Sequence, residues 1–341
     1  MEHDGGISRR KEEHVRGALE LAAVPHSGAF DNYRVVHNAL PEIALNDVDA
    51  SCEFLGKKLR APFMIASLTG GPELAGKINE NLAKGAQRTG VPVALGSARI
   101  AIHDSSTLSS FQVRSLCPDV PLLANLGLVD LDRAFDINDC RELVKKLHAD
   151  ALIFHVNPLH EALQTEGNTD FAGLLERLRR AVHELEFPVI VKEVGHGISA
   201  EVFRKLDECG VYAVDVSGAG GTSWGYIEGR RDKDPMLKRV CRTFSNWGIP
   251  AVSILEGLRE TRRNAKLIAS GGIRSGVDVF KAVCLGADLG AAGLPFLEPA
   301  LQNPEAVADV LRQFILEFRL AMFAAGCRDL SQTGLHLLES R

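Results

Sequence analysis

Residues 187–216 read Phe-Pro-Val-Ile-Val-Lys-Glu-Val-Gly-His-Gly-Ile-Ser-Ala-Glu-Val-Phe-Arg-Lys-Leu-Asp-Glu-Cys-Gly-Val-Tyr-Ala-Val-Asp-Val. Two short apolar runs, Phe187–Val194 and Val211–Val216, flank the segment Ala200–Leu206, whose apolar residues are three and four positions apart. Short runs that are apolar on both faces are typical of buried parallel strands, and the intervening spacing is typical of an amphipathic helix. The stretch therefore predicts a strand, a helix and a second strand.

The same alternation recurs along most of the chain, and a second helical pattern lies at Asn138–Leu147. Eight apolar runs are the predicted strands: Ala61–Leu68, Val91–Leu95, Val120–Leu126, Ala149–Val156, Phe187–Val194, Val211–Val216, Ala265–Ala269 and Ala287–Ala292. Eight strand–helix units are typical of a TIM (β/α)8 barrel, whereas a doubly wound sheet usually has five or six strands. The sequence therefore predicts an α/β protein built as a (β/α)8 barrel.

Two further segments frame the predicted barrel. Residues 1–60 contain one predicted helix, Lys11–Ala23, and we expect this N-terminal arm to pack on the barrel, residues 61–341, within a single domain. Near the C-terminus, Asn303-Pro304 is a favourable helix start and Gly326 a favourable helix end. We therefore expect a long C-terminal helix between them.

Composition excludes several classes of partner. The 341 residues are 45% hydrophobic and 24% charged, and the net charge of −5 comes with scattered lysines and arginines, which argues against a nucleic-acid partner. No apolar run is long enough to cross a membrane, and the first residues do not resemble a secretion signal. The seven cysteines form no Cys-x-x-Cys pair and are typical of reduced, buried thiols. We therefore expect a cytoplasmic protein with neither a nucleic-acid nor a membrane partner.

The residues that follow the predicted strands are rich in glycine and polar side chains. In a TIM barrel the active site lies at these strand ends. Ser270-Gly271-Gly272-Ile273-Arg274 after the seventh strand and Ala292-Gly293 after the eighth favour a phosphate-binding site. The alternative is that these glycines only form tight turns. Neither a Walker A motif nor a G-x-G-x-x-G after the first strand is present, which argues against an ATP P-loop and a Rossmann NAD site.

Lys192 interrupts an otherwise apolar strand. Burying a lysine costs free energy unless the side chain meets a ligand or an opposite charge. One interpretation places its ammonium at the electron-rich edge of a flavin, where it stabilises the reduced anion. The alternative is a purely structural pair with Glu161 or Glu193.

Glu161, in the loop after the fourth strand, is a candidate ligand of Mg²⁺, which proteins commonly bind through one or two carboxylates and substrate phosphates. His155 and His160 lie nearby in the sequence, but their spacing and the lack of a third clear ligand argue against zinc. Arg10 and Lys11 lie at a predicted helix start, where cations are unfavourable unless they meet a phosphate. A solvated, charged arm is the alternative.

Taken together, these segments resemble the type 2 isopentenyl diphosphate isomerases, an FMN-dependent family. The resemblance extends over nearly the whole chain. It rests on Arg10-Lys11-x-x-His14, His37-Asn38-Ala39-Leu40-Pro41-Glu42, Phe54-Leu55-Gly56-Lys57, Ser67-Leu68-Thr69-Gly70-Gly71, Ala124-Asn125-Leu126-Gly127, Val191-Lys192-Glu193-Val194-Gly195, and residues 214–224, Val-Asp-Val-Ser-Gly-Ala-Gly-Gly-Thr-Ser-Trp.

The resemblance implies a set of binding residues. FMN would be contacted by Ala66, Ser67, Leu68, Ser97, Asn125, Lys192, Ser217, Thr222, Gly271, Gly272, Ile273, Arg274, Ala292 and Gly293. The substrate would be bound by Arg10, Lys11, Ser97, Ala98, Arg99, His155, Asn157 and His160, with Glu161 on Mg²⁺. These residues lie largely at the strand ends that the physical argument selects.

The resemblance also implies a reaction. Isopentenyl diphosphate becomes dimethylallyl diphosphate when a proton is added at C4 and another is removed at C2, with no net redox change. Reduced FMN, regenerated by NADPH, is implied to act as acid or base through N5, and Mg²⁺ is implied to hold the diphosphate. A homo-oligomer, either a tetramer or an octamer, is implied as well.

One departure from the family concerns the loop after the fourth strand. The family usually has Asn-x-x-Gln-Glu there, whereas this chain has Asn157-Pro158-Leu159-His160-Glu161. An unperturbed histidine titrates near neutrality, so we expect His160 to transfer a proton in place of the glutamine, with Lys192 as the other catalytic residue. The alternative is a relative with a changed substrate.

Two other functions compete with isomerisation. An FMN-dependent 2-hydroxy-acid oxidase shares the barrel and the strand-five lysine, and here it would use His160 as base and Arg99 for the substrate carboxylate. The N-terminal cations and Glu161 would then have no function. A flavin-binding regulatory or scaffold protein is the third possibility, and the many polar residues at the strand ends argue against it.

Overall fold

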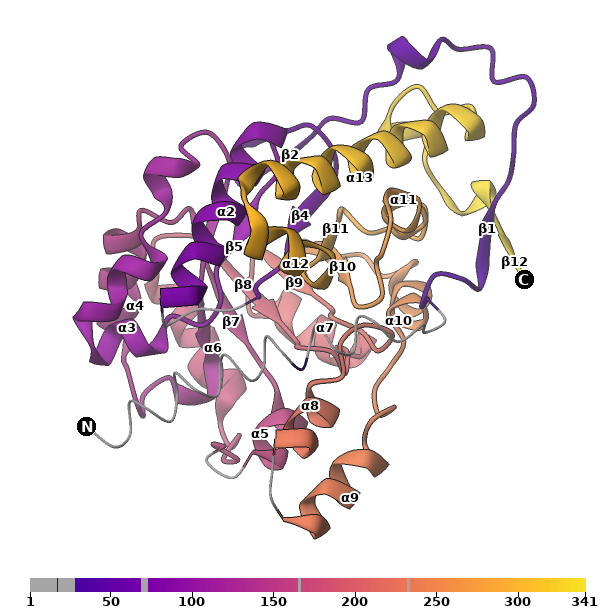
Figure 1. Ribbon diagram of the computed structural model, residues 1–341. Helices are drawn as coiled ribbons and strands as arrows, with labels where there is room; N and C mark the ends of the chain where they lie inside the picture. The colour runs from indigo at the N-terminus through magenta and orange to yellow at the C-terminus, as the bar shows by residue number, and fades with distance from the viewer. Residues whose placement is uncertain (1–16, 18–27, 69–72, 165–166, 232–233) are drawn as a thin grey trace.

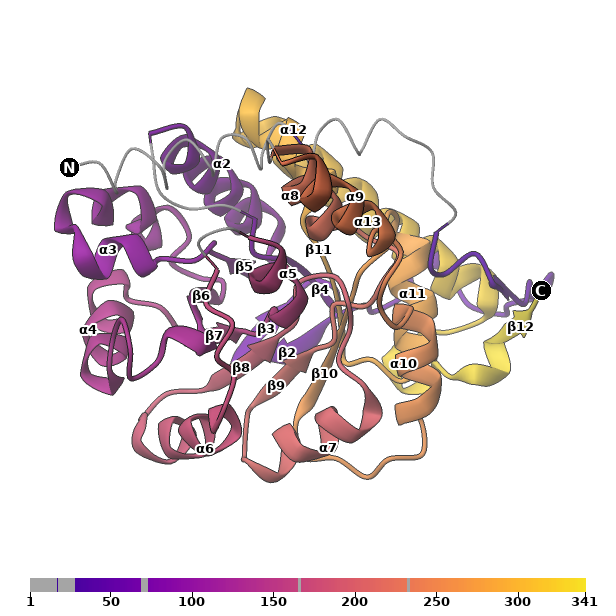
Figure 2. The same cartoon turned by 90° about the horizontal axis from the view of Figure 1, so that it is seen from below.

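The computed structural model describes residue 17 and residues 28–68, 73–164, 167–231 and 234–341. Its centre is a closed barrel of eight parallel strands that follow one another around the barrel in sequence order (Figures 1 and 2). The strands are β4 (Phe63–Ile65), β5 (Val93–Ala94), β6 (Leu122–Gly127), β7 (Ala151–His155), β8 (Val189–Lys192), β9 (Ala213–Asp215), β10 (Lys266–Ser270) and β11 (Leu289–Ala292). Each strand coincides with one of the eight predicted runs, so the predicted TIM barrel is confirmed.

Helices surround the barrel and extend over one of its ends (Figure 2). They are α2 (Glu73–Thr89), α3 (Arg99–His103), α4 (Ile137–Leu147), α5 (Pro158–Leu163), α6 (Leu174–Glu184), α7 (Ala200–Glu208), α8 (Trp224–Arg231), α9 (Pro235–Thr243), α10 (Ala251–Leu258), α11 (Gly276–Cys284), α12 (Leu294–Gln302) and α13 (Pro304–Ala325). Short 3-10 turns are η1 (Leu45–Asp47), η2 (Ser105–Phe111), η3 (Arg114–Leu116), η4 (Leu128–Asp130), η5 (Leu330–Gln332) and η6 (Leu335–Leu337). The two helices predicted at Asn138–Leu147 and Ala200–Leu206 are confirmed as α4 and α7.

The long C-terminal helix α13 begins and ends as its sequence predicts. The Asn303 side chain accepts a hydrogen bond from the Ala306 N–H, which satisfies a free donor of the first turn. Gly326 has a positive φ of 79°, a conformation that glycine adopts at little cost. Beyond α13, strand β12 (Leu338–Ser340) pairs antiparallel with β1 (Tyr33–Val35), so that the C-terminal end of the chain lies beside the start of the described N-terminal segment (Figure 1).

A hairpin closes one end of the barrel. Strands β2 (Cys52–Phe54) and β3 (Lys57–Leu59) carry Phe54 and Leu59, which are buried in the same apolar cluster as the side chains that fill the barrel interior. The Phe54 ring packs edge-on against Tyr212, and the Leu55 N–H donates to the Tyr212 hydroxyl at 2.9 Å. Tyr212 precedes β9, so the hairpin lies at the N-terminal end of the strands. The C-terminal end of the strands, where TIM barrels form their active sites, is not covered by this hairpin.

The structure tests the other sequence-based predictions only in part. The predicted helix Lys11–Ala23 lies outside the described residues, apart from Gly17, and the division of the chain at residue 60 stays a prediction. Residues after 27 do contact the barrel, because Phe30 is buried and its carbonyl accepts from Lys281 Nζ at 3.1 Å. All seven cysteines are free thiols. Within the described ranges, no helix combines the length and the apolar character needed to cross a membrane.

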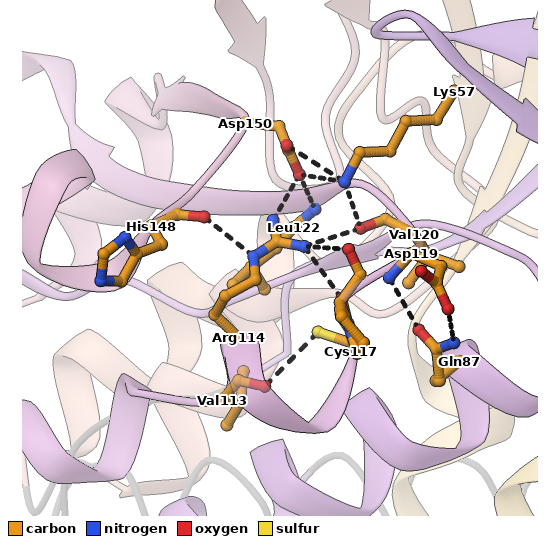
Figure 3. Close-up of polar contacts among 11 residues, drawn as sticks. Lys57, Gln87, Val113, Arg114, Cys117, Asp119, Val120, Leu122, His148 and Asp150 are labelled. Atoms are coloured by element: carbon orange, nitrogen blue, oxygen red, sulfur yellow. Dashed lines mark hydrogen bonds and ion pairs between the residues drawn. The ribbon is translucent and has the colours of Figure 1, made fainter.

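An ion-pair cluster holds the N-terminal ends of β6 and β7 (Figure 3). The Asp150 carboxylate pairs with Arg114, lies 3.2 Å from Lys57 Nζ and accepts the Leu122 N–H at 2.7 Å. Arg114 also donates to the carbonyl of Val120 at 3.0 Å. One carboxylate thus connects the hairpin, the segment before β6 and the start of β7.

We expect Asp150→Ala to lower the free energy of unfolding by about 3 kcal/mol, because it leaves two partly buried cations without their counter-charge and a backbone N–H without its acceptor. Equilibrium urea unfolding of the apoprotein measures the change. The control is Glu176→Ala, whose partner Arg179 is 48% exposed; this surface pair should contribute less than about 1 kcal/mol. Equal losses in the two variants would contradict a structural role for the cluster.

Candidate functional site

Most buried polar side chains lie at the C-terminal ends of the barrel strands or in the loops that follow them. These residues are Asn125, Asp130, Asn157, Lys192, Glu193, Asp215, Ser217, Glu228 and Ser270. The remaining buried polar side chains are on α2 and α11. Buried polar groups cost free energy unless they are paired, so their concentration at one end identifies the candidate site.

Lys192 is paired with a residue that the sequence argument did not consider. Its Nζ lies 3.0 Å from Asp215 Oδ2 and donates to Ser217 Oγ at 3.1 Å. Lys192 on β8 is the direct register partner of Asp215 on β9, so the two side chains leave the sheet on the same side. The alternative pairing with Glu161 or Glu193 is therefore wrong, although Lys192 does have a counter-charge.

Glu193 points elsewhere and organises the loop after β8. Its Oε2 accepts the backbone N–H groups of Gly195, His196 and Gly197 at 2.7, 2.5 and 3.0 Å. Burial opposes ionisation of this carboxyl, but the hydrogen bonds from His196 and Gly195 outweigh it and lower the pKa of Glu193. Because successive side chains of a strand point to opposite faces, Lys192 and Glu193 contact different groups. Lys192 pairs with Asp215, and Glu193 binds the backbone of the following loop.

A second polar chain joins β4, β6 and β7. Asn125 Nδ2 donates to Ser67 Oγ at 2.9 Å, and its Oδ1 lies 2.8 Å from His155 Nδ1. An amide oxygen only accepts, so His155 carries a proton on Nδ1. Burial lowers the pKa of His155 to about 4, which the nearby Asp130 only partly opposes. His155 is therefore a neutral imidazole at pH 7.

Arg99 stands at the start of α3, beside the predicted binding residues Ser97 and Ala98. Its Nη1 lies 2.7 Å from Asp130 Oδ2, and the Arg99 side chain is 34% exposed. The Ala98 N–H donates to the Asn125 carbonyl at 2.9 Å, which ties this turn to β6. The guanidinium is thus oriented by a carboxylate while part of it remains accessible to a ligand.

The glycines after β10 are required by close backbone contacts. Gly271 and Gly272 have φ values of 93° and 87°, and a Cβ on Gly271 would lie 1.9 Å from the Gly218 carbonyl oxygen. Arg274 follows them, with its N–H bonded to Asp278 Oδ2, and Ser275 caps α11. On the neighbouring side, the Ala66 N–H donates to the Ala292 carbonyl. The predicted phosphate-binding residues after β10 and β11 thus lie on adjacent strands. Gly271 and Gly272 form the tight turns, and the side chain of Arg274 is exposed.

The loop after β7 forms the short helix α5, which packs against α8 (Figure 1). His160 Nε2 lies 3.0 Å from Glu228 Oε1 on α8, and His160 Nδ1 lies 3.2 Å from Asn157 Nδ2. Asn157 Nδ2 also donates to Glu161 Oε1 at 2.9 Å, whereas the buried Asn157 Oδ1 has no hydrogen-bond partner among the described residues. His160, Asn157 and Glu161 are therefore in mutual contact, whereas their roles in binding substrate and Mg²⁺ stay predictions.

Glu228 was missed by the sequence analysis. It is 68 positions from His160 and only 5% of its side chain is exposed. One signal was available, since Glu228 lies one turn after Trp224 in a short helical segment that directly follows the glycine-rich loop of β9. A carboxylate on the inward face of such a segment is a candidate site residue.

Other predicted residues are placed less completely. Thr222 lies in the loop after β9, and its carbonyl oxygen would be 2.9 Å from a Cβ on Gly195. Leu68 lies over Gly293, where a Cβ would be 2.6 Å from Leu68 Cδ2. Arg10 and Lys11 lie outside the described residues. Among the residues that are described, no group of three or more His, Cys, Asp or Glu side chains could hold a metal ion by itself.

We expect His155 to remain neutral above about pH 5 in the apoprotein. Because its folded-state pKa of about 4 lies below the ordinary 6.5, the unfolded chain binds more protons between these values, so the free energy of unfolding falls as the pH falls through this window. His155→Gln should remove that part of the pH dependence, at most roughly 3 kcal/mol. Urea unfolding at pH 4.5 and 7 tests the slope. The His155 imidazole signal is identified in the NMR spectrum of the wild type by its absence from that of His155→Gln. Titration of this signal near pH 6.5 would contradict the assignment of His155 as neutral.

Comparison with known proteins agrees with this geometry. A family model described as FMN-dependent dehydrogenase matches residues 17–107 and 147–340. Curated proteins named isopentenyl-diphosphate delta-isomerase, from Nostoc sp. and Synechococcus sp., are 42% and 43% identical to the chain, covering 95% and 96% of it and 93% and 94% of their own length.

Solved structures with the same fold are more distant. A flavocytochrome b2 variant with sulfite bound has a TM-score of 0.68 at 18% identity, covering 96% of this chain and 91% of that chain. A chimera of (S)-mandelate dehydrogenase has a TM-score of 0.65, also at 18% identity, covering 97% and 92%. These two similarities establish only the fold. The family match and the relatives above 40% identity establish more: the chain belongs to the FMN-dependent dehydrogenase family and, within it, to the type 2 isopentenyl-diphosphate delta-isomerases.

Proposed function

We propose that this protein converts isopentenyl diphosphate to dimethylallyl diphosphate, using FMN and Mg²⁺, with no net redox change. The observation that carries the proposal is the buried Lys192 at the open end of the barrel, next to strand ends whose glycines allow close approach of a phosphate. Curated relatives near 40% identity have the isomerase name, which favours isomerisation over the 2-hydroxy-acid oxidation suggested by structural neighbours at 18% identity.

The residues at the barrel mouth fit FMN chemically. The turns at Gly271 and Gly272 leave no room for side chains, so backbone N–H groups and the N-terminal end of α11 are the groups available to a phosphate. Lys192 offers a cation to the ring, and Asn125 and Ser217 offer polar contacts. When bound and reduced, FMN supplies a ring nitrogen that can act as acid or base. NADPH is the proposed reductant.

The proposed substrate site lies between α3 and α5. Arg99 presents a partly exposed guanidinium, and the neutral His155 offers the lone pair of Nε2. The Glu161 carboxylate, held by the Asn157 amide at 2.9 Å, is an oxygen ligand that fits Mg²⁺ when phosphate oxygens and water complete its shell. In this proposal, Arg10 and Lys11 also bind the diphosphate.

His160 is proposed to transfer a proton at the reacting carbons. If His160 Nδ1 accepts from Asn157, Nε2 carries the proton and donates to Glu228. Transfer to the substrate requires one of these ring nitrogens to release its present partner, and the Glu228 carboxylate can then take up or return the proton. The pair is nearly enclosed, with exposed fractions of 13% for His160 and 5% for Glu228, which limits exchange with bulk water.

The remaining proposals concern the localisation and the oligomeric state of the protein. We propose a cytoplasmic homo-oligomer, a tetramer or octamer, with a small-molecule substrate. Leu316 and Leu320 support an interface, because they are one turn apart on α13 and are 51% and 42% exposed.

We expect turnover of isopentenyl diphosphate by the purified protein under anaerobic conditions with FMN, NADPH and Mg²⁺. His160→Gln should keep activity within about ten-fold, because glutamine can bond both Asn157 and Glu228, whereas His160→Phe should lose at least about 100-fold in kcat. The product is quantified by chromatography of the diphosphates. A protein that binds FMN but shows no turnover, both as wild type and as His160→Gln, would refute the isomerase proposal.

We expect Glu161→Gln to raise the Mg²⁺ concentration for half-maximal turnover by at least about ten-fold, because a neutral amide replaces the carboxylate ligand. FMN absorbance should remain that of the wild type. Glu142→Gln, which changes a carboxylate on the outer helix α4, is the matched control. An unchanged Mg²⁺ requirement in Glu161→Gln would exclude Glu161 as the ligand.

A further inference from the structure

Asp215 is the centre of a buried cluster that joins three neighbouring strands. Its Oδ2 lies 3.0 Å from Lys192 Nζ on β8. Its Oδ1 accepts from Ser270 Oγ at the end of β10 at 2.5 Å and from the Ser217 N–H at 3.2 Å. The exposed fractions of Asp215, Lys192, Ser217 and Ser270 are only 4, 8, 5 and 3%. Hydrogen bonds from two sides therefore hold the carboxylate against the ammonium.

The cluster also fixes the direction of the ammonium. Two of the three donors of Lys192 are directed to Asp215 and Ser217. Ser217 has a φ of 39°, a conformation that residues other than glycine seldom adopt, and its N–H is bonded to Asp215. The Asp215 carboxylate thus positions Lys192 directly and also through the turn that carries the Ser217 hydroxyl.

The charge of Asp215 has a consequence for any ligand above the barrel. Lys192 and Asp215 are register partners on adjacent strands, so both charges lie at the same level of the barrel. A ligand at the strand ends experiences the sum of the two charges, and in a poorly hydrated site each charge acts strongly. The carboxylate therefore offsets part of the stabilisation that Lys192 gives to an anion.

We propose that Asp215 is a positioning residue that holds Lys192 and limits how strongly Lys192 stabilises the reduced, anionic flavin. The inference rests on the proposed placement of FMN over Lys192. A moderated stabilisation suits a reaction with no net redox change, because the flavin then works as an acid or base without being held in one oxidation state. Asp215 would thus set the redox balance of the cofactor without touching it.

The test is Asp215→Asn, which removes the charge and keeps an oxygen that can accept from Lys192. The measured quantity is the ratio of the dissociation constants of oxidised and reduced FMN, obtained from fluorescence titration and anaerobic equilibration with a reference dye. We expect the dissociation constant of oxidised FMN, divided by that of reduced FMN, to rise roughly ten-fold. This is the scale of the effect of one unit charge inside a protein. An unchanged or smaller ratio would overturn the proposal. If Asp215→Asn does not fold, Asp215→Ser replaces it with the same expected direction.

Two control variants distinguish a failure of the proposed role of Asp215 from a failure of the proposed FMN placement. Asp288→Asn removes another carboxylate paired with cations, 2.6 Å from Arg263 and 3.1 Å from Lys266, but before β11 at the opposite end of the barrel, and should leave the ratio unchanged. Lys192→Met should lower the ratio. If Lys192→Met has no effect although FMN binds, the flavin does not lie over this pair, and the FMN placement fails together with the inference. Isomerase turnover is measured separately, so the reaction and the redox role can fail independently.

Discussion

The register between β8 and β9 is the constraint on which the candidate site depends. It places Lys192 and Asp215 side by side inside the barrel, where neither charge could be buried alone without a cost of several kcal/mol. Because the strands are parallel, their ends carry the following loops to the same face. One buried cation with its counter-charge thus becomes the base of a site to which the other strands contribute hydrogen-bonding groups.

The polar groups at the two ends of the barrel differ in their partners. At the N-terminal end, the β2–β3 hairpin fills the opening, and carboxylates such as Asp150 and Asp288 connect cations to the first N–H groups of neighbouring strands. At the C-terminal end, polar groups include Asn157 Oδ1, which has no partner within the described part of the chain, and a partly exposed Arg99. The ion-pair clusters and the candidate ligand-binding groups therefore lie at opposite ends of the same strands.

Inserted helices complete the mouth. Helix α5 follows β7 and helix α8 follows β9, and their contact brings His160 to Glu228. The substitution of histidine for the glutamine that is usual in the family is thus accommodated by a carboxylate that can pair with either residue. His155, a neutral imidazole because burial lowers its pKa to about 4, is the last residue of β7, the strand that leads into α5.

The sequence by itself determined the eight strands, the caps of α13, the glycine turns at Gly271 and Gly272, and the need of Lys192 for a ligand or a counter-charge. These features depend on local periodicity, on capping chemistry and on the cost of one charge in an apolar run, all of which are visible in short segments. Only the tertiary structure decided that Lys192 pairs with Asp215, that His160 meets Glu228, and that His155 is neutral. Those facts depend on strand register, on contacts between residues 23 to 68 positions apart and on burial, none of which a linear pattern contains.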